Sequence, residues 1–457
     1  MTKIKLALAI FFSKLTYFVF KLCGRNASHS PGVVALKICP DYFAAVKKPP
    51  LTICVTGTNG KTTCTNMVSD VLEANGLKVA TNRLGSNIAP GCATALTNSV
   101  NLFGKPKCDA LVLEVDERAS RLILPYLKPD YLAVTNLFRD SLMRNANPDY
   151  IFSILDTYIP ENTKLILNAD DIFSSQLRPQ NEKVYFGIVK QDSDCIDSVN
   201  LVTDSSFCPK CYTKLVYNYR RYHHIGNVYC PQCGFASPKA DYLVTEIDRE
   251  NKTLTIDEKG AQRQYRLIND ALYNVYNQLT VTAVLKEAGF TDEQLQKAYG
   301  ELSIVKTRMT QNKVGNIELD TVLVKGQNSV SASRSFDYIA SQPGKKALIF
   351  AYDDGGYRKN SIEFTGWIYD ADFEYLNNEN VVQYVVAGPR CYDNVLRLLM
   401  AGVDKSKIVT TEDESNAPGL LKTDGIDAVY ILHDTTTVDI AKRLFAETEK
   451  ILRGAQK

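Results

Sequence analysis

Histidine is scarce in this sequence of 457 residues, which contains only four. They are His29, His223, His224 and His433. None accompanies a cysteine or a serine in an arrangement typical of an activated nucleophile, so nucleophilic catalysis within this chain is not expected. We interpret all four as structural histidines.

Net charge is also small, +2 at pH 7, because 53 Lys and Arg residues nearly balance 51 Asp and Glu residues. Nucleic-acid binding usually requires a basic surface, so this balance gives a nucleic-acid partner no support. Internal repeats and low-complexity segments are missing as well. At this length we expect two or three domains.

A long uncharged apolar run is likewise missing. Residues 3–25 have a basic start and an apolar body, as a signal peptide has. Lys14 and Lys21 interrupt the segment, whereas a membrane span needs about 20 apolar residues. Together with Lys3 and Arg25 they would form one narrow stripe on a helix. The segment is therefore predicted to be an amphipathic helix with a basic edge. Such a helix packs on the protein body or rests on an anionic membrane surface.

The twelve cysteines do not form an obvious disulfide framework. Eight are scattered, mostly in apolar stretches, which suits a reducing compartment. These eight are Cys23, Cys39, Cys54, Cys64, Cys92, Cys108, Cys195 and Cys391. We therefore expect a cytoplasmic protein.

The other four cysteines form two CxxC pairs separated by eighteen residues: Cys208 with Cys211, and Cys230 with Cys233. This spacing is typical of a tetrahedral Zn²⁺ site. Four thiolates leave no open coordination position, so the zinc would be structural. A redox CxxC is the alternative, and the repetition of the motif argues against it.

Short runs rich in Val, Ile and Leu alternate with helical stretches between about residues 51 and 187. This pattern predicts a parallel sheet with crossover helices. The predicted strands are 51–56, 78–81, 110–116, 131–136 and 164–170, and the first crossover helix is 61–76.

The later sequence divides further. Residues 203–241 hold the CxxC pairs and interrupt the pattern, as an insertion would. Alternating residues then predict antiparallel strands over 241–267, followed by a helix over 273–289. A second, smaller α/β unit is predicted to follow, with strands at 345–354, 381–388, 407–412 and 428–434 and helices at 392–402 and 437–452. The expected domains are 1–50, 51–305 and 313–457.

The stretch TGTNGKTT lies between a predicted strand and a predicted helix, where glycines let backbone N–H groups approach a phosphate. Lys61 would reach the terminal phosphates and the Thr62 hydroxyl would ligate Mg²⁺. The spacing is not that of a standard phosphate loop, because Val55 stands where the first glycine belongs. The expected nucleotide-binding residues are Gly57, Thr58, Asn59, Gly60, Lys61, Thr62 and Thr63.

Two acidic residues lie near the carboxyl end of the predicted strand 110–116: Glu114 within it and Glu117 directly after it. The carboxyl end of a parallel strand lies at the edge where such sheets bind ligands. Either carboxylate could hold Mg²⁺ through oxygen. The alternative is a pair of solvated loop acids.

These motifs together resemble the Mur ligase superfamily, the ATP-dependent amide-bond formers of cell-wall synthesis and folate polyglutamylation. Within it the chain is most similar to the synthetase subunits that amidate lipid II. The resemblance covers nearly the whole chain, through PGVVALKICPD, GTNGKTT, LEVDE, TNLFRD, the four cysteines, LYNVYN and WIYDADFE. It implies a Mur ligase-type central parallel-sheet domain with an inserted zinc ribbon, and a smaller Rossmann-like C-terminal domain.

The resemblance also implies a reaction, in which ATP activates the α-carboxylate of D-glutamate in lipid II and ammonia converts it to D-isoglutamine. A separate GatD-like glutaminase would supply the ammonia, at the inner face of the membrane. Carried over by position, Glu114 is the Mg²⁺ ligand and Asn274 meets the nucleotide. Asp354 would complete the Cys–His pair of the glutaminase.

The sequence departs from this family at several positions. In the stretch TRMT, residues 307–310, only Arg308 matches the family pattern. In the stretch KGQN, residues 325–328, only Lys325 matches it. Asp354 follows Asp353 rather than a small residue. Two alternatives therefore stay open. One is a ligase joining another amine to a different carboxylate, and the other is a non-catalytic homologue that binds ATP.

Overall fold

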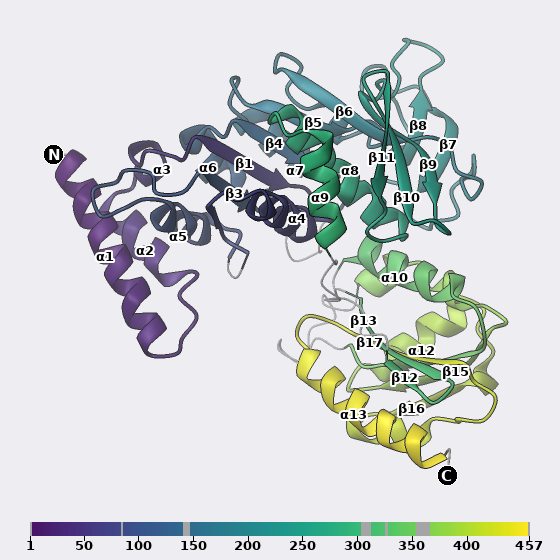
Figure 1. Cartoon of the computed structure of the whole chain (residues 1–457). Helices are drawn as coiled ribbons and strands as arrows, with labels where there is room; N and C mark the ends of the chain where they lie inside the picture. Colours follow the sequence, from purple (N-terminus) through teal and green to yellow (C-terminus); the bar gives the residue numbers. More distant parts are fainter. Residues whose placement is uncertain are drawn as a thin grey trace. The chain divides into compact units, whose positions relative to one another are not determined.

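The computed structural model describes residues 2–83, 86–139, 147–302, 312–324, 328–352 and 366–455 (Figure 1). Its contacts divide the chain into two units. The first comprises Met1–Phe138, Asn147–Ser198 and Asp204–Ile304. The second comprises Arg139–Ala146, Val199–Thr203 and Val305–Lys457.

The first unit begins with three helices, α1 (Thr2–Leu22), α2 (Ser30–Ile38) and α3 (Tyr42–Ala45). Figure 1 shows α1 lying along α2, and both contact α5 (Ala89–Ser99). The predicted N-terminal helix is therefore confirmed.

Lys14, on the predicted basic edge of this helix, contacts the protein body, as one of the two alternatives for this helix predicted. The Lys14 Nζ donates to the carbonyls of Thr97 at 3.0 Å and Val100 at 2.7 Å. These carbonyls end α5, where unpaired carbonyl oxygens favour a cation. Burial and the neighbouring Lys107 lower the pKa of Lys14 to about 8. Lys14 thus binds α1 to the end of α5.

A nine-stranded sheet forms the centre of the first unit, in the order β11-β10-β9-β6-β5-β4-β1-β3-β2. Strands β1 to β6 and β9 pair in parallel with one another. Strand β10 pairs antiparallel with both β9 and β11. The bounds are β1 (Leu51–Thr56), β2 (Val79–Thr81), β3 (Ala110–Glu114), β4 (Tyr131–Val134), β5 (Lys164–Asn168), β6 (Lys183–Ile188), β9 (Tyr242–Asp248), β10 (Thr253–Glu258) and β11 (Ala261–Arg266). The five predicted parallel strands and the later antiparallel strands are confirmed. Strand β6 was not predicted, and it joins β9 to the parallel strands.

Helices bury the strands from both sides, as a parallel sheet requires. Alternate strand residues, such as Leu111, Leu132 and Leu165, share one core with helices α5 to α7. Helices α4 and α8 contact each other and strands of the same sheet. The bounds are α4 (Lys61–Ala74), α6 (Ser120–Leu127), α7 (Pro148–Tyr158), α8 (Leu272–Glu287) and α9 (Asp292–Glu301).

The predicted insertion contains a separate two-stranded sheet of β7 (Val216–Tyr222) and β8 (Ile225–Tyr229). It has a small core of its own, in which Leu215, Val228 and Phe235 pack with Cys208 and Cys230.

The second unit contains a six-stranded sheet in the order β12-β13-β17-β14-β15-β16, parallel except for β12. Leu348 and Phe350 share a core with α10, α11 and α12, whereas Ala347 and Ile349 share one with α13. Helices therefore cover both faces. The bounds are β12 (Asn312–Val314), β13 (Ile317–Leu323), β14 (Lys346–Phe350), β15 (Val381–Ala387), β16 (Ile408–Thr411), β17 (Ala428–His433), α10 (Ser329–Ser341), α11 (Trp367–Asp370), α12 (Cys391–Met400) and α13 (Val438–Ala455). The four predicted strands and both predicted helices are confirmed, and β13 was not predicted.

Candidate nucleotide-binding site

The carboxyl ends of β1, β3 and β4 meet at one edge of the large sheet, the edge at which parallel sheets bind ligands. The register places Val55 beside Glu114 and Thr56 beside Val134. The fold thereby brings together the predicted phosphate loop, the predicted acidic pair and the segment after β4.

The segment after β4 holds the phosphate loop in shape. The Asn136 side chain accepts from the Asn59 N–H at 3.0 Å and donates to the Asn59 carbonyl at 3.1 Å. The Thr135 hydroxyl donates to the same carbonyl at 2.6 Å. The Phe138 N–H donates to the Thr58 hydroxyl at 2.9 Å. Sequence reasoning did not assign Thr135 or Asn136 to the site, although both belong to the TNLFRD motif of the family resemblance and lie at the end of a predicted strand.

Gly57 and Gly60 are also required by the packing behind the loop, in addition to the predicted approach to a phosphate. Their φ angles are +122° and +88°, a region that residues with a Cβ rarely adopt. A Cβ on Gly57 would lie 2.3 Å from the Thr135 hydroxyl oxygen, and one on Gly60 would lie 2.3 Å from the Asn277 Oδ1. The missing side chains therefore let the loop approach the protein behind it.

Lys61 is the first residue of α4, and its side chain folds back into the phosphate loop that precedes it. Its Nζ is 3.1 Å from Glu117 Oε1, and these side chains are only 11% and 7% exposed. It also donates to the carbonyls of Gly57 and Thr58. Burial opposes the charged form of Lys61, but Glu117 and Glu114 outweigh it and raise its pKa. Lys61 is therefore protonated at neutral pH.

Two predicted magnesium ligands lie at the same edge. Thr62 is exposed at the start of α4, and Glu114 is partly buried. The Asn87 amide donates to Glu114 Oε1 at 2.9 Å. Asn82 accepts from the Glu114 N–H at 2.9 Å and donates to its carbonyl at 2.8 Å. A hydroxyl and a carboxylate offer the oxygen ligands that Mg²⁺ prefers, so the residues fit the predicted ion.

Helix α8 contacts the loop from behind. The Asn277 amide donates to Asn274 Oδ1 at 3.2 Å, and the Asn274 amide donates to Asn269 Oδ1 at 2.9 Å. The Cys64 thiol is 3.5 Å from Asn277 Oδ1. The structure thus connects Asn274, which was predicted, to the loop through Asn277, which was not.

A buried arginine lies close to this region. Arg221, on β7, is 1% exposed and binds Asp194 through two bonds of 3.2 and 2.8 Å. A third bond of 3.1 Å reaches Asp170, just beyond β5, and further bonds reach the carbonyls of Ile188 and Val189. Burial opposes its charge, and the surrounding groups raise its pKa above the usual value. No local sequence pattern indicates this network.

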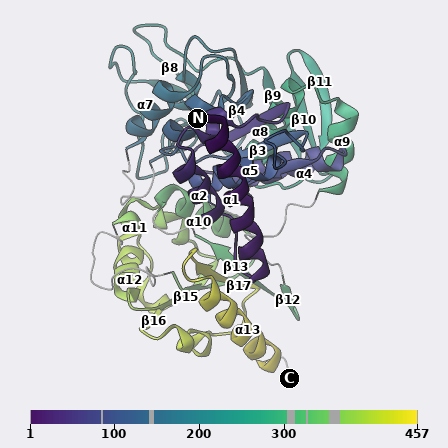
Figure 2. The same ribbon diagram turned by 90° about the vertical axis from the view of Figure 1, so that its left-hand side faces the viewer.

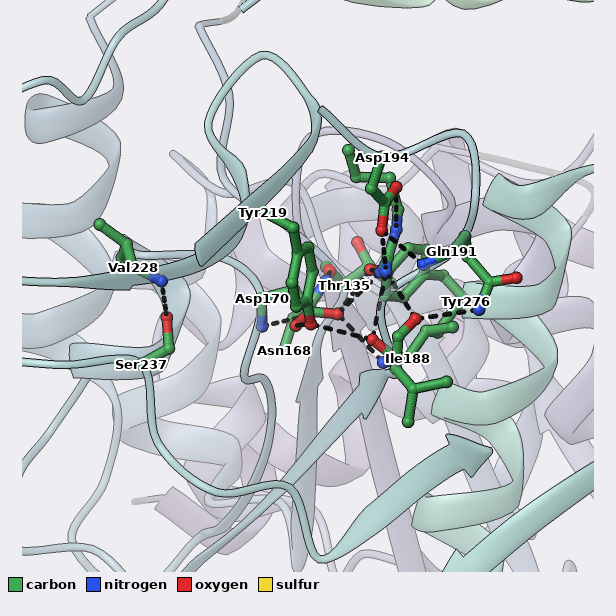
Figure 3. A network of polar contacts seen from close by, with 12 residues as sticks. Thr135, Asn168, Asp170, Ile188, Gln191, Asp194, Tyr219, Val228, Ser237 and Tyr276 are labelled. Carbon is green, nitrogen blue, oxygen red and sulfur yellow. Dashed lines mark hydrogen bonds and ion pairs between the residues drawn. The ribbon is translucent and has the colours of Figure 1, made fainter. Parts of the chain in front are cut away.

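Figure 3 shows Tyr219, Tyr276, Asp170 and Asp194 in this network. The Tyr276 hydroxyl donates to Asp170 Oδ2 at 2.6 Å. Tyr276 belongs to α8, in the turn between Asn274 and Asn277. The network therefore links the inserted hairpin to the helix that supports the phosphate loop.

Asp171, the residue after Asp170, links the inserted hairpin to the segment after β4. Asp171 Oδ2 accepts from the Leu137 N–H at 2.7 Å, and Asp171 Oδ1 lies 3.2 Å from His224 Nε2. Asn168 donates to the Thr135 carbonyl at 3.1 Å. Both supports of the loop are thus tied to the hairpin.

The four paired cysteines come together at the end of this hairpin. Their sulfur atoms all lie within 4.8 Å of one another. Cys208 and Cys233 are 3.5 Å apart, and Cys211 and Cys230 are 3.4 Å apart. A tetrahedral site with Zn–S bonds of about 2.3 Å separates its sulfurs by about 3.8 Å. The cluster therefore fits a structural zinc ion.

We expect the purified protein to contain one Zn²⁺ per chain, bound by Cys208, Cys211, Cys230 and Cys233. Cys230→Ser should lose the metal and loosen the insertion while nucleotide binding is largely kept. Elemental analysis and nucleotide titration measure the two effects, with the exposed Cys23→Ser as the control. A disulfide within either pair, or no zinc in freshly purified protein, would contradict the assignment.

Four predicted residues lie outside the described part of the chain: Arg308, Lys325, Asp353 and Asp354.

The family model described as "Mur ligase middle domain" matches residues 55–214. The model described as "MurT ligase C-terminal" matches residues 323–438. The MurT subunit of lipid II isoglutaminyl synthase from Staphylococcus aureus strain COL is 30% identical over 405 residues, covering 88% of this chain and 89% of that protein. The MurT subunit from Streptococcus pneumoniae R6 is 28% identical over 98% of both chains.

Solved structures show the same fold at low identity. A pseudomurein peptide ligase type C from Methanothermus fervidus has a TM-score of 0.66 and 19% identity, covering 89% of this chain and 79% of that one. MurF ligase from Thermotoga maritima, solved in complex with ADP, has a TM-score of 0.59 and 14% identity, covering 93% and 85%.

Proposed function

Because the chain belongs to the MurT family of the Mur ligases, we propose that it is the ATP-using subunit of a lipid II isoglutaminyl synthase. Its proposed reaction converts the α-carboxylate of D-glutamate in lipid II to the carboxamide of D-isoglutamine. The similar S. aureus and S. pneumoniae proteins carry this enzyme's name. The observation that carries the proposal is Lys61, held in a glycine loop at the start of a helix and beside acidic residues.

The chemistry requires activation, because a carboxylate oxygen is a poor leaving group. Transfer of the γ-phosphoryl group of ATP to that oxygen would give an acyl phosphate and ADP. The nitrogen of ammonia then attacks the carbonyl carbon, the C–O bond to phosphate breaks, and the nitrogen loses a proton. The products are the carboxamide, ADP and inorganic phosphate.

The loop and helix α4 would bind the phosphates through backbone N–H groups and the positive helix end. Lys61 would exchange its contact with Glu117 for the terminal phosphates and neutralise charge that builds during transfer. Bound Mg²⁺ would neutralise further phosphate charge, and Thr62 and Glu114 are the residues proposed to hold it. Asn87 and Asn82 would orient Glu114 for that role. Asn274 is proposed to meet the nucleotide.

Turnover separates this function from its alternatives. ATP hydrolysis that depends on both lipid II and ammonia is the expected result. Hydrolysis only with another amine or carboxylate would identify a different Mur-type ligase. Nucleotide binding without turnover under any of these conditions would identify a non-catalytic homologue.

A GatD-like glutaminase is the proposed source of ammonia. The relatives are named as subunits of a glutamine-hydrolysing enzyme, and the four histidines of this sequence suggest no Cys–His site. A glutaminase histidine needs an acceptor on its second ring nitrogen, which fixes the tautomer. Asp354 is proposed to be that acceptor, so glutamine hydrolysis would depend on assembly. The proposed location is the cytoplasm, at the inner face of the membrane.

Asp354→Asn should severely reduce amidation driven by glutamine and leave amidation driven by free ammonium intact. The amide retains the shape of the side chain but removes the negative charge that stabilises an imidazolium. Product formation with each nitrogen source, in the presence of the glutaminase, measures the difference. Asp353→Asn is the control for the neighbouring carboxylate. If both variants use glutamine as well as the parent, or if this chain alone hydrolyses glutamine, the assignment fails.

A further inference from the structure

Helix α1 exposes a continuous apolar face. Eight large apolar side chains between Ile4 and Leu22, including Phe11, Phe12 and Phe18, are 43–71% exposed. They recur every three or four residues, which places them on one side of a helix. The opposite side packs on the protein through buried Ile10 and other residues. Figure 2 shows α1 as the foremost helix of the first unit, in front of α2 and α5.

A neighbouring loop extends this apolar face. We call residues 101–105 the Phe103 loop, a turn closed by the bond from the Asn101 N–H to the Lys105 carbonyl at 2.8 Å. Its Leu102 and Phe103 are 56% and 88% exposed. A Cβ on Gly104 would lie 3.2 Å from the Ile10 side chain, so the loop adjoins α1.

Helix α1 and the segment that follows it, as far as residue 40, carry charge of a single sign. The first forty residues contain six Lys and Arg residues and no Asp or Glu. Lys3 and Lys5 are exposed near one end of α1, and Lys21 and Arg25 are exposed at or just beyond the other. The exposed Lys105 and Lys107 follow Phe103 in the sequence.

We propose that α1 and the Phe103 loop dock on the surface of an anionic lipid bilayer, with the helix lying in the plane of the interface. A helix with apolar residues on one side and flanking cations binds such an interface through apolar burial and attraction to anionic headgroups. At 1.5 Å per residue, the 21 residues of α1 are about 30 Å long, which suits an extended flat partner. Within the described residues, no helix is long and apolar enough to cross a membrane.

The distribution of charge disfavours a second copy of the chain as the occupant. In a parallel pair Lys3 and Lys5 would face their own copies, and in an antiparallel pair they would face Lys21 and Arg25. Either arrangement brings like charges together, which is unfavourable. A bilayer with anionic headgroups offers the opposite sign over the whole length of the helix.

This inference does not depend on the acceptor of the proposed reaction. Bilayer docking would, however, place any lipid-linked acceptor and the ligase on the same surface. A failure of docking would leave the proposed amidation untouched, because lipid II in detergent can still be assayed.

Sedimentation of the full chain with phospholipid vesicles tests the proposal. Binding to vesicles that contain phosphatidylglycerol should be roughly tenfold or more tighter than binding to pure phosphatidylcholine, and salt should weaken it. The double variant Phe11→Ser/Phe18→Ser and the double variant Lys3→Glu/Lys21→Glu should each lose most of this binding. Tyr392→Ser/Met400→Ser is the matched control, since both side chains are exposed on α12, at 63% and 62%.

Circular dichroism of each variant verifies folding, and light scattering of the parent gives its oligomeric state. Equal binding to both kinds of vesicle, or undiminished binding by the Phe11→Ser/Phe18→Ser variant, would overturn the proposal. So would a dimer that this variant dissociates, because the apolar face would then belong to a second copy.

Discussion

Lys61→Ala is expected to abolish ATP-dependent ligation, with a fall in turnover on the order of a thousandfold. Charge builds on the γ-phosphoryl oxygens during transfer, and we propose that the ammonium group of Lys61 is the cation that the loop supplies there. The raised pKa of Lys61, held up by Glu117 and Glu114 against burial, keeps this group charged throughout the physiological pH range. The measurement is phosphate release with the acceptor and ammonium both at saturation.

The control for this experiment is Lys78→Ala, which removes an exposed lysine from the same unit. Lys61→Ala also leaves Glu117 buried without its cation, so thermal unfolding must be compared with that of the double variant Lys61→Ala/Glu117→Gln. Both variants should be inactive, and the double variant should recover stability. Full ligation by a folded Lys61→Ala protein would mean that the loop binds something other than the reacting phosphates.

Arg221→Met should destabilise the first unit by about 3–5 kcal/mol, because breaking a buried ion pair leaves an uncompensated charge. Here two carboxylates lose their partner at once: Asp170 and Asp194, whose side chains are 5% and 1% exposed. Urea unfolding followed by circular dichroism measures the change. Nucleotide affinity should also fall, because Tyr276 shares this network and lies between Asn274 and Asn277 on α8.

Arg249→Met is the matched control, since Arg249 is exposed on the turn between β9 and β10. Arg221→Lys separates charge from geometry, because lysine retains the charge but cannot form the two-bond contact with Asp194. We expect this variant to be intermediate. An Arg221→Met protein with the stability and nucleotide affinity of the parent would show that the hairpin and the loop are independent.

The sequence could predict those parts of the fold and site whose signal is local. Buried strands read as runs of Val, Ile and Leu, and the phosphate loop is contiguous, so β1, α4 and Lys61 were all found. Strand β6, KVYFGI, was missed because its apolar run is short and contains Gly187. Its membership in the sheet is decided by pairing with β5 and β9, which no local pattern reports.

The supports of the site could not be predicted, because their partners are distant in the chain. Asn136 lies 77 residues from Asn59, and Arg221 lies 51 residues from Asp170. The contacts of Lys14 are another example. Its spacing with Lys21 predicts a shared edge of the helix, but its hydrogen bonds reach carbonyls at the end of α5, 83 and 86 residues away.

The most direct test of the proposed function is mass spectrometry of lipid II after incubation with the purified chain, ATP, Mg²⁺ and isotope-labelled ammonium. The account predicts that the label enters the α-carboxamide of the D-glutamate residue, with one ADP formed for each amide, and that Lys61→Ala protein gives none. Unlabelled lipid II, in the presence of folded protein that binds nucleotide, would contradict it.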